Sequence, residues 1–148
     1  MAAIPPWETI ARMSVDGGNP RQLKSVLCID DEVDIQSIIK ISLERLGGIE
    51  AHFCTDPLHG MARAREVAPD LILLDFLMPG LDGAALFERL QADPELARIP
   101  VVFLTAVMTG PAARKLNSLG AAGVLIKPFD VVALPRRLAA IWAGLQSV

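Results

Sequence analysis

The stretch DLILLDFLMPGLDG, residues 70–83, constrains the fold more than any other part of this sequence. Its four consecutive apolar residues end on a carboxylate, Asp75, and a loop rich in proline and glycine follows at once. Short continuous apolar runs are typical of strands buried on both faces of a parallel sheet. The pattern therefore places Asp75 at the carboxyl end of a buried strand, the edge where open α/β sheets bind ligands. An aspartate at a strand end is more often a helix cap than a reactive group, so its role depends on the other strand ends.

Four further apolar runs have the same character, and segments with helical periodicity separate them. The predicted strands are residues 25–30, 49–54, 70–75, 100–104 and 123–126. The predicted helices span about 35–46, 56–68, 83–91 and 111–120, and a last helix has Pro135 in its first turn. Strands that alternate with helices form a parallel sheet covered on both faces by right-handed crossovers. The sequence thus predicts an α/β fold, a doubly wound five-stranded parallel sheet with five helices.

Helical spacing also predicts which side chains face the core. In the first helix the buried face consists of Ile35, Ile38, Ile39, Ser42, Leu43 and Leu46. The opposite side consists of Gln36, Lys40 and Glu44, and Ile41 falls outside the apolar stripe. In the last helix the apolar face consists of Leu134, Leu138, Ile141 and Leu145.

Composition and charge exclude several classes of function. The 148 residues suffice for one domain with a substantial core, and 52% of them are hydrophobic. A net charge of -3, a pI near 5.3 and the lack of a basic stripe argue against nucleic acid as a partner. No apolar run is long enough to span a membrane and no signal peptide is evident, so we expect a cytoplasmic protein without membrane binding.

The cysteines and histidines are not arranged as a metal site. Cys28 and Cys54 lie within strand-like runs and are predicted to be buried small hydrophobes. His52 and His59 have no partner at metal-ligand spacing.

Residues 1–24 are predicted to form a flexible N-terminal leader, and residues 25–146 form the domain. Proline and glycine break any periodicity in the leader. Trp7, Ile10 and Met13 nevertheless have helical spacing. Two interpretations remain, a short docking turn and a disordered or vector-derived tail.

Polar residues follow four of the predicted strands, at the edge where their carboxyl ends meet. They are Asp30, Asp31, Asp75, Thr105 and Lys127. Three carboxylates held together repel one another unless a cation binds among them, and oxygen ligands alone suit Mg²⁺. A lysine and a threonine hydroxyl suit phosphoryl oxygens. Together these groups meet the needs of phosphoryl transfer, with Asp75 as the nucleophile and the acidic pair as ligands of the ion.

Each of these residues has a simpler interpretation when it is taken alone. The acidic pair, Asp30 and Asp31, suits a helix N-terminus, which attracts negative charge. Lys127 alone suits a solvated surface position. The four strand ends together are much harder to explain as chance, which favours the phosphoryl-transfer hypothesis.

On these residues the chain resembles a receiver domain of the two-component response regulators. The resemblance covers residues 25–146 and depends on the acidic pair, on Asp75 with its MPGLDG loop, on Thr105-Ala106 and on Lys127-Pro128. It implies a flavodoxin-like, CheY-like sheet with the strand order 2-1-3-4-5. Because little sequence follows the last helix, we expect the stand-alone form of such a receiver.

The resemblance also implies the roles of the site residues. Mg²⁺ would be coordinated by Asp31, Asp75 and the backbone carbonyl of Leu77, with Asp30 acting largely through water. Thr105 and Lys127 would bind the phosphoryl oxygens. Thr105 would then move toward the phosphoryl group, and this movement would change the surface of the fourth helix, the fifth strand and the fifth helix.

The partners follow from the same resemblance. A sensor histidine kinase or a histidine phosphotransfer protein would donate the phosphoryl group to Asp75, and the receiver would act as an acceptor rather than as an enzyme. It would signal to a downstream protein target, or pass the group on, as a monomer or a weak homodimer. Ile41, Val107 and Met108 are candidate contacts for the donor's helix bundle.

One position departs from the family pattern. The family usually has an aromatic residue three positions before the lysine, where its side chain couples to the threonine, and here that residue is Val124. The chemistry is then expected to be intact while the aromatic half of the switch is missing.

Three other functions compete with this interpretation. A phosphate-independent docking module with the receiver fold is favoured slightly by Val124 and by the leader. A phosphohydrolase needs a second carboxylate two residues after the nucleophile, and that residue is Leu77. A nucleotide-binding protein needs a glycine-rich phosphate loop, and no such loop follows any of the predicted strands.

Overall fold

The computed structural model describes residues 21–106 and 109–146, and its centre is a parallel sheet. The strands are β1 (Ser25–Ile29), β2 (Glu50–Cys54), β3 (Leu71–Asp75), β4 (Val101–Thr105) and β5 (Gly123–Ile126). They lie in the order β2-β1-β3-β4-β5, and every neighbouring pair is parallel. The predicted fold class and strand order are therefore confirmed.

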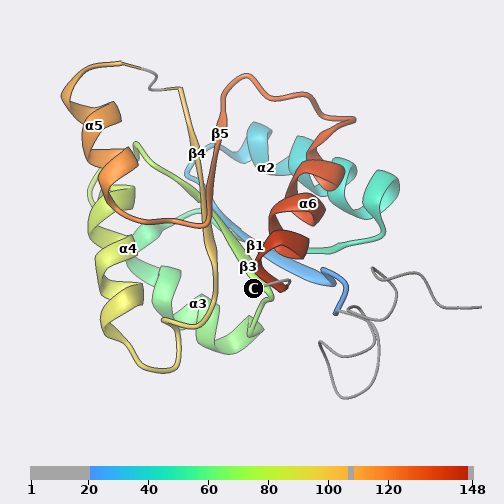
Figure 1. Ribbon diagram of the computed structural model, residues 1–148, viewed down its shortest axis with the longest axis horizontal. Helices are drawn as coiled ribbons and strands as arrows, with labels where there is room; N and C mark the ends of the chain where they lie inside the picture. The colour runs from blue at the N-terminus through green and yellow to red at the C-terminus, as the bar shows by residue number, and fades with distance from the viewer. Residues whose placement is uncertain (1–20, 107–108, 147–148) are drawn as a thin grey trace, which may run out of the picture.

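Helices connect the strands and cover both faces of the sheet (Figure 1). They are α2 (Val33–Ile41), which continues as the π-helix η1 (Ser42–Leu46), the 3₁₀ turn η2 (Pro57–His59) with α3 (Gly60–Val67), α4 (Gly83–Ala92), α5 (Gly110–Ser118) and α6 (Leu134–Gln146). In Figure 1, α3, α4 and α5 lie on one side of the sheet, and α2 and α6 lie on the other. The described chain thus has the five predicted α-helices.

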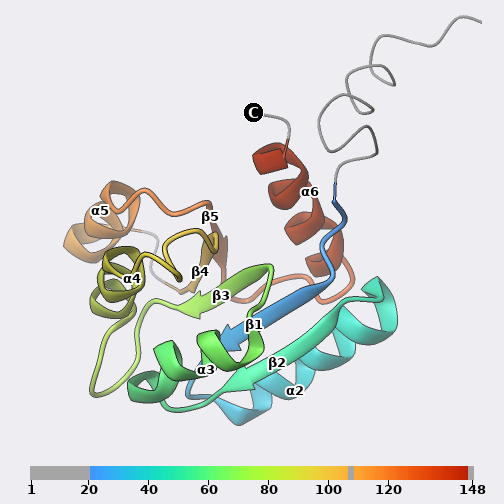
Figure 2. The same ribbon diagram turned by 90° about the horizontal axis from the view of Figure 1, so that it is seen from below.

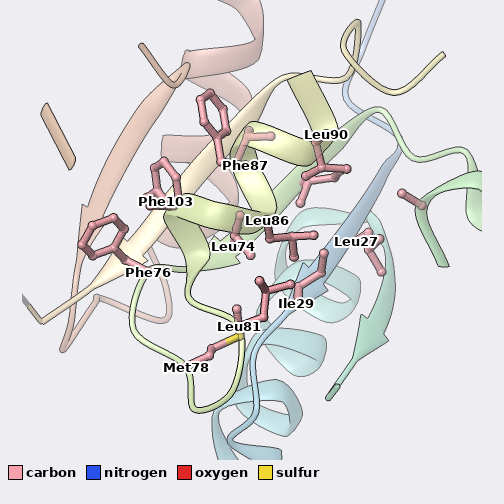
Figure 3. Close-up of a cluster of buried hydrophobic side chains, with 14 of the residues drawn as sticks. Leu27, Ile29, Leu74, Phe76, Met78, Leu81, Leu86, Phe87, Leu90 and Phe103 are labelled. Atoms are coloured by element: carbon pink, nitrogen blue, oxygen red, sulfur yellow. The ribbon is translucent and has the colours of Figure 1, made fainter. Parts of the chain in front are cut away.

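The sheet separates two hydrophobic clusters that hold the strands in place. One cluster is formed by the sheet with α3, α4 and α5, and Figure 3 shows its side chains from the strands, from α4 and from the loop before α4. At its centre Phe103 contacts Phe76 and Phe87, with 5.4 Å between the ring centroids in each pair. The second cluster lies beneath α2 and α6 and includes Ile39 and Leu138. Every residue of β3 and β4 is buried as a result, because these strands lie inside the sheet with helices on both faces.

The first helix buries part of the predicted face and departs from it at three positions. Ile39, Ser42 and Leu43 are buried, as predicted. Gln36, predicted on the solvent side, is buried, and its amide donates hydrogen bonds to the backbone carbonyls of Asp30 (2.8 Å) and Cys54 (3.1 Å). Ile38 and Leu46, predicted on the core side, are 40% and 56% exposed. The helix passes over two strand-end carbonyls that need a donor, which an apolar side chain cannot supply. The π-helical end also departs from the 3.6-residue repeat on which the prediction depends.

The last helix is anchored by Trp142, which the predicted apolar face did not include. Trp142 is buried, and its indole N–H donates to the backbone carbonyl of Arg21 at 2.8 Å. Leu145, which was predicted on that face, is exposed in the last turn of α6. The prediction at this end of the helix was therefore wrong, because the contact with the segment before β1 is not visible in the periodicity of α6.

The segment that leads into β1 is held to the domain. Leu23 is buried, and the backbone N–H of Lys24 donates to the Asp70 carboxylate at 2.9 Å. Arg21 forms an ion pair with the same carboxylate at 2.7 Å. These residues end the stretch predicted as a leader, and the rest of that stretch, residues 1–20, lies outside the described residues.

Two predictions from composition can also be compared with the structure. Cys28 and Cys54 are both buried and free, as predicted. Among the described residues, no helix has the length and apolar character required to cross a bilayer. The candidate contact residues Val107 and Met108 lie outside the described residues, whereas Ile41 is exposed on α2.

Replacing Gly83 with alanine is expected to destabilise the domain by about 1–3 kcal/mol, the usual cost of overpacking. A Cβ atom at this position would lie 2.5 Å from the carbonyl oxygen of Asp75 and 2.8 Å from the Cα of Phe76, and backbone atoms cannot rotate away. Gly144→Ala in α6 is the matched control, because a Cβ there meets nothing within 4 Å and alanine favours the helix. Urea unfolding measures both variants, and equal effects on stability would contradict the prediction.

Candidate functional site

Asp75 ends β3, the central strand of the sheet, and is only 3% exposed. Pairing with β1 and β4 fixes the strand on both sides. In the loop that follows, the N–H of Leu77 donates to the Asp75 carboxylate at 3.3 Å. Further along, the N–H of Gly83 donates to the carbonyl of Phe76 at 2.9 Å. The close approach that only glycine allows at residue 83 therefore holds the loop beside the carboxylate.

Three more carboxylates gather around Asp75 from the end of β1. Asp30 is buried, whereas Asp31 and Glu32 are exposed. One carboxylate oxygen from each of the four residues lies within 4.8 Å of the others. The parallel register of β1 and β3 causes this, because it brings the residues that follow the two strands side by side.

Glu32 belongs to this cluster although the sequence analysis did not include it among the site residues. Its position directly before α2 suits a helix cap, but its side chain makes no capping hydrogen bond to the helix. Its carboxylate instead pairs with Lys127 at 3.2 Å. The signal that could have identified it is the unbroken acidic run that it forms with Asp30 and Asp31.

Lys127 follows β5 and places its ammonium group among the acidic residues. Its Nζ lies 3.3 Å from Asp30 Oδ2, 3.2 Å from Glu32 Oε1 and 3.5 Å from Asp75 Oδ2. Its backbone N–H donates to the carbonyl of Thr105 at 2.8 Å, which fixes the end of β5 beside β4. One lysine is therefore shared by three carboxylates.

The other two predicted residues adjoin this cluster. Thr105 is buried at the end of β4, where the preceding residue, Leu104, pairs with Asp75 across the sheet. Leu77 lies in the loop after β3, with an exposed side chain and its N–H directed at Asp75. The structure thus gathers the three predicted aspartates and the lysine, and it places the threonine and the leucine on the adjoining strand end and loop.

Burial and mutual repulsion shift the titration of these groups. Burial, and then the charge of Asp30, raise the pKa of Asp75 to about 6, and Lys127 opposes them. Burial likewise raises the pKa of Asp30 above its ordinary value. Burial lowers the pKa of Lys127, but the two aspartates outweigh it and hold that pKa above its ordinary value. The cluster therefore has too little positive charge for its carboxylates.

The donor set fits a hard divalent cation. The four candidate ligands are all carboxylates, with no histidine or thiol among them. Mg²⁺ prefers such oxygen ligands together with water and phosphate oxygens. The raised pKa of Asp75 is consistent with this assignment, because the charge of Asp30 is its second cause after burial, and a bound cation would oppose both.

Comparison with known families shows where this arrangement belongs. The sequence pattern of the response regulator receiver domain matches residues 26–139, which are most of the chain. The chain belongs to the response regulator receiver family. Receiver domains generally bind Mg²⁺ at an acidic pocket, and this chain has an acidic cluster. The resemblance stated from the sequence is confirmed.

Curated relatives of this receiver domain differ in length. The DNA-binding dual master transcriptional regulator RpaA of Synechocystis is 37% identical over 118 residues, which are 78% of this chain and 48% of that protein. The chemotaxis protein CheY-3 of Vibrio cholerae is 28% identical over 120 residues, which are 81% of this chain and 92% of that protein. The receiver chain thus spans about half of the first relative and nearly all of the second.

Solved structures show the same fold. The signal receiver domain of a histidine kinase from Syntrophus aciditrophicus superposes with a TM-score of 0.74 at 27% identity, covering 82% of this chain and 92% of that one. The N-terminal domain of a response regulator receiver protein from Methanoculleus marisnigri superposes with a TM-score of 0.64 at 28% identity, covering 77% and 92%. The CheY-like fold class is therefore confirmed.

Asp75→Asn is expected to stabilise the metal-free receiver domain at pH 7.5 by about 3 kcal/mol at most, at roughly 1.36 kcal/mol per pKa unit. The pKa of Asp75 is about 6 in the folded protein and 3.8 ordinarily, so the folded state binds this proton more tightly than the unfolded state. The wild type should therefore gain stability as the pH falls through 6, and the difference from the variant should shrink. Urea unfolding in EDTA at pH 7.5 and 5 measures it, and a difference independent of pH would contradict the assignment.

Proposed function

We propose that this receiver domain accepts a phosphoryl group on Asp75 from a sensor histidine kinase or a histidine phosphotransfer protein. The observation that carries the proposal is the position of the Asp75 carboxylate, which is buried, fixed at a central strand end and 3.5 Å from Lys127. With a pKa of about 6, the carboxylate is ionised at neutral pH and more basic than an ordinary aspartate. Both properties suit a nucleophile.

In the proposed step, a carboxylate oxygen of Asp75 attacks the phosphorus atom of a phosphohistidine. A P–O bond forms while the P–N bond breaks, and the electron pair of the broken bond returns to the imidazole nitrogen. Lys127, whose ammonium already lies beside the attacking carboxylate, stabilises the negative charge on the phosphoryl oxygens. Thr105 provides a hydroxyl at the neighbouring strand end that hydrogen-bonds one of these oxygens.

Mg²⁺ is the cofactor that fits the donor set. We assign it to Asp31, Asp75 and the backbone carbonyl of Leu77, with Asp30 acting largely through water. Bound Mg²⁺ supplies positive charge against the phosphoryl oxygens and relieves the repulsion among the carboxylates. Glu32 lies in the same cluster and forms an ion pair with Lys127. When the lysine turns to the phosphoryl group, we expect this ion pair to break and to release the Glu32 carboxylate.

The proposed output is contact with a downstream protein or onward transfer of the phosphoryl group. The receiver is then a stoichiometric acceptor and not an enzyme, because Asp75 leaves the step modified. We expect it to act as a monomer or weak homodimer, and the net charge of -3 favours protein partners over nucleic acid.

Incubation with acetyl phosphate and Mg²⁺ is expected to add one phosphoryl group to the purified protein. Asp75→Asn should abolish the addition, because the amide is not a nucleophile, and EDTA should reduce it strongly. Intact-mass spectrometry measures the modified fraction over time.

Asp82→Asn is the matched control for this experiment. Asp82 is exposed and caps α4 by accepting a hydrogen bond from the N–H of Ala85 at 2.7 Å, a role that asparagine also fills. The control should be phosphorylated like the wild type. No addition to the wild type under any condition would overturn the proposal and favour the phosphate-independent docking module.

A phosphoryl mimic such as beryllofluoride is expected to shift the amide resonances of residues 105–113 with little change at Val124. Val124 is half-buried against the core and pairs with Phe103, so it presents no aromatic ring that could follow Thr105. Two-dimensional NMR with and without the mimic tests this, with Asp75→Asn as the negative control. Large shifts confined to β5 would refute it.

A further inference from the structure

A groove lies between α6 and the end of η1, and it shares no residue with the acidic cluster. Its volume is about 600 Å³. Most of its lining is apolar and is contributed by Leu46, Ile49, Pro135, Ala139, Trp142 and Ala143. Leu46 is 56% exposed there, and Ala139 and Ala143 are exposed as well, so the described chain leaves an apolar surface uncovered.

The segment that leads into β1 forms one wall of this groove. Arg21, Gln22 and Leu23 line it, and Figure 2 shows this segment beside α6. The carbonyl of Arg21 accepts the hydrogen bond from Trp142, and its guanidinium lies 5.2 Å from the centroid of the Trp142 ring. Arg21 is also the first described residue. The preceding residues, 1–20, are therefore attached to the chain at the groove itself.

We propose that the groove is an intramolecular docking site for residues 7–13 of this chain. Trp7, Ile10 and Met13 are spaced by three residues, so a helix of about two turns would present all three on the same side. An indole and two flexible apolar side chains are suitable to cover an apolar groove, and tryptophan is the side chain that contributes most at such contacts.

Charge does not oppose this occupant. Arg136 lines the groove, is exposed and forms no ion pair within residues 21–106 and 109–146. Residues 7–13 contain one acidic and one basic residue, Glu8 and Arg12, so the segment has no net charge. The exposed arginine therefore does not repel the segment, and the apolar side chains and the attachment at Arg21 favour this occupant.

The tether makes even a weak contact effective. Residues 14–20 can span at most roughly 25 Å when fully extended, at about 3.6 Å per residue. Gly17 and Gly18 lie in this link, and glycine lets the chain turn back on itself. A short link gives an effective concentration on the order of 1 mM, so a groove that binds the free segment with a Kd of about 1 mM would be half occupied.

Fluorescence quenching in the full-length protein tests the proposal. The chain contains two tryptophans, so the difference between the wild type and Trp7→Phe isolates the signal of Trp7. Docking predicts that acrylamide quenches Trp7 several-fold less than it quenches N-acetyltryptophanamide. It also predicts NMR cross-peaks between the Trp7 indole and the methyl groups of Leu46 and Ala143.

A matched pair of substitutions separates docking from a general effect on the fold. Leu46→Ser removes an apolar wall of the groove and should expose Trp7 to the quencher. Ile41→Ser makes the same kind of change on the preceding helix, at a residue that is 55% exposed and outside the groove, and should leave Trp7 shielded. Both side chains are more than half exposed, so both variants are expected to fold.

Three outcomes would overturn the proposal. The first is a Trp7 that is as accessible in the wild type as the free indole compound. The second is shielding that persists in Leu46→Ser. The third is shielding that rises with protein concentration together with a dimer in sedimentation, which would assign the groove to the leader of a second copy.

Discussion

The ammonium group of Lys127 lies within 3.5 Å of carboxylate oxygens from three different residues, and the site depends on this arrangement. The parallel sheet brings it about, because the ends of β1, β3 and β5 deliver their charged residues to one edge. In a flexible segment, the repulsion among the carboxylates would drive these side chains apart. The buried strands hold them together against their repulsion, and the two hydrophobic clusters provide the stabilisation that this requires.

The carboxylates carry more negative charge than Lys127 can neutralise, and this excess favours binding of a cation at the site. A fully neutralised cluster would have little affinity for a cation, whereas here four carboxylates surround a single ammonium group, so added positive charge is favourable. In the proposed function, a metal ion would complement the site with positive charge, and a phosphoryl group would then offer oxygens to the lysine. The same imbalance reduces the stability of the unmodified domain, so stability and function oppose each other here.

Gln36 connects the helix layer to this chemistry. Its amide bonds the strand-end carbonyls of Asp30 and Cys54, so α2 is fixed directly behind the acidic turn. Gly83 has a similar role on the opposite face of the sheet, because it lets the start of α4 pack against the backbone at the end of β3. Each of the two acidic strand ends is thus supported by one short, specific contact from a neighbouring helix.

The amino-acid sequence by itself determined the alternation of strands and helices and the positions of Asp30, Asp31, Asp75 and Lys127. These follow from local patterns, since each residue ends an apolar run or comes directly after it, and parallel strands must bring such ends together. Only the tertiary structure decided that Glu32 pairs with the lysine instead of capping its helix, because that contact joins residues far apart in the sequence.

The burial of Gln36 and Trp142 was decided in the same way. Helical periodicity describes how a helix repeats, but not which neighbouring segment needs a hydrogen-bond donor or a large ring. The carbonyls that these two side chains satisfy belong to Asp30 directly after β1, to Cys54 at the end of β2, and to Arg21 in the segment before β1. Their positions are fixed only when the sheet and both helices have packed together.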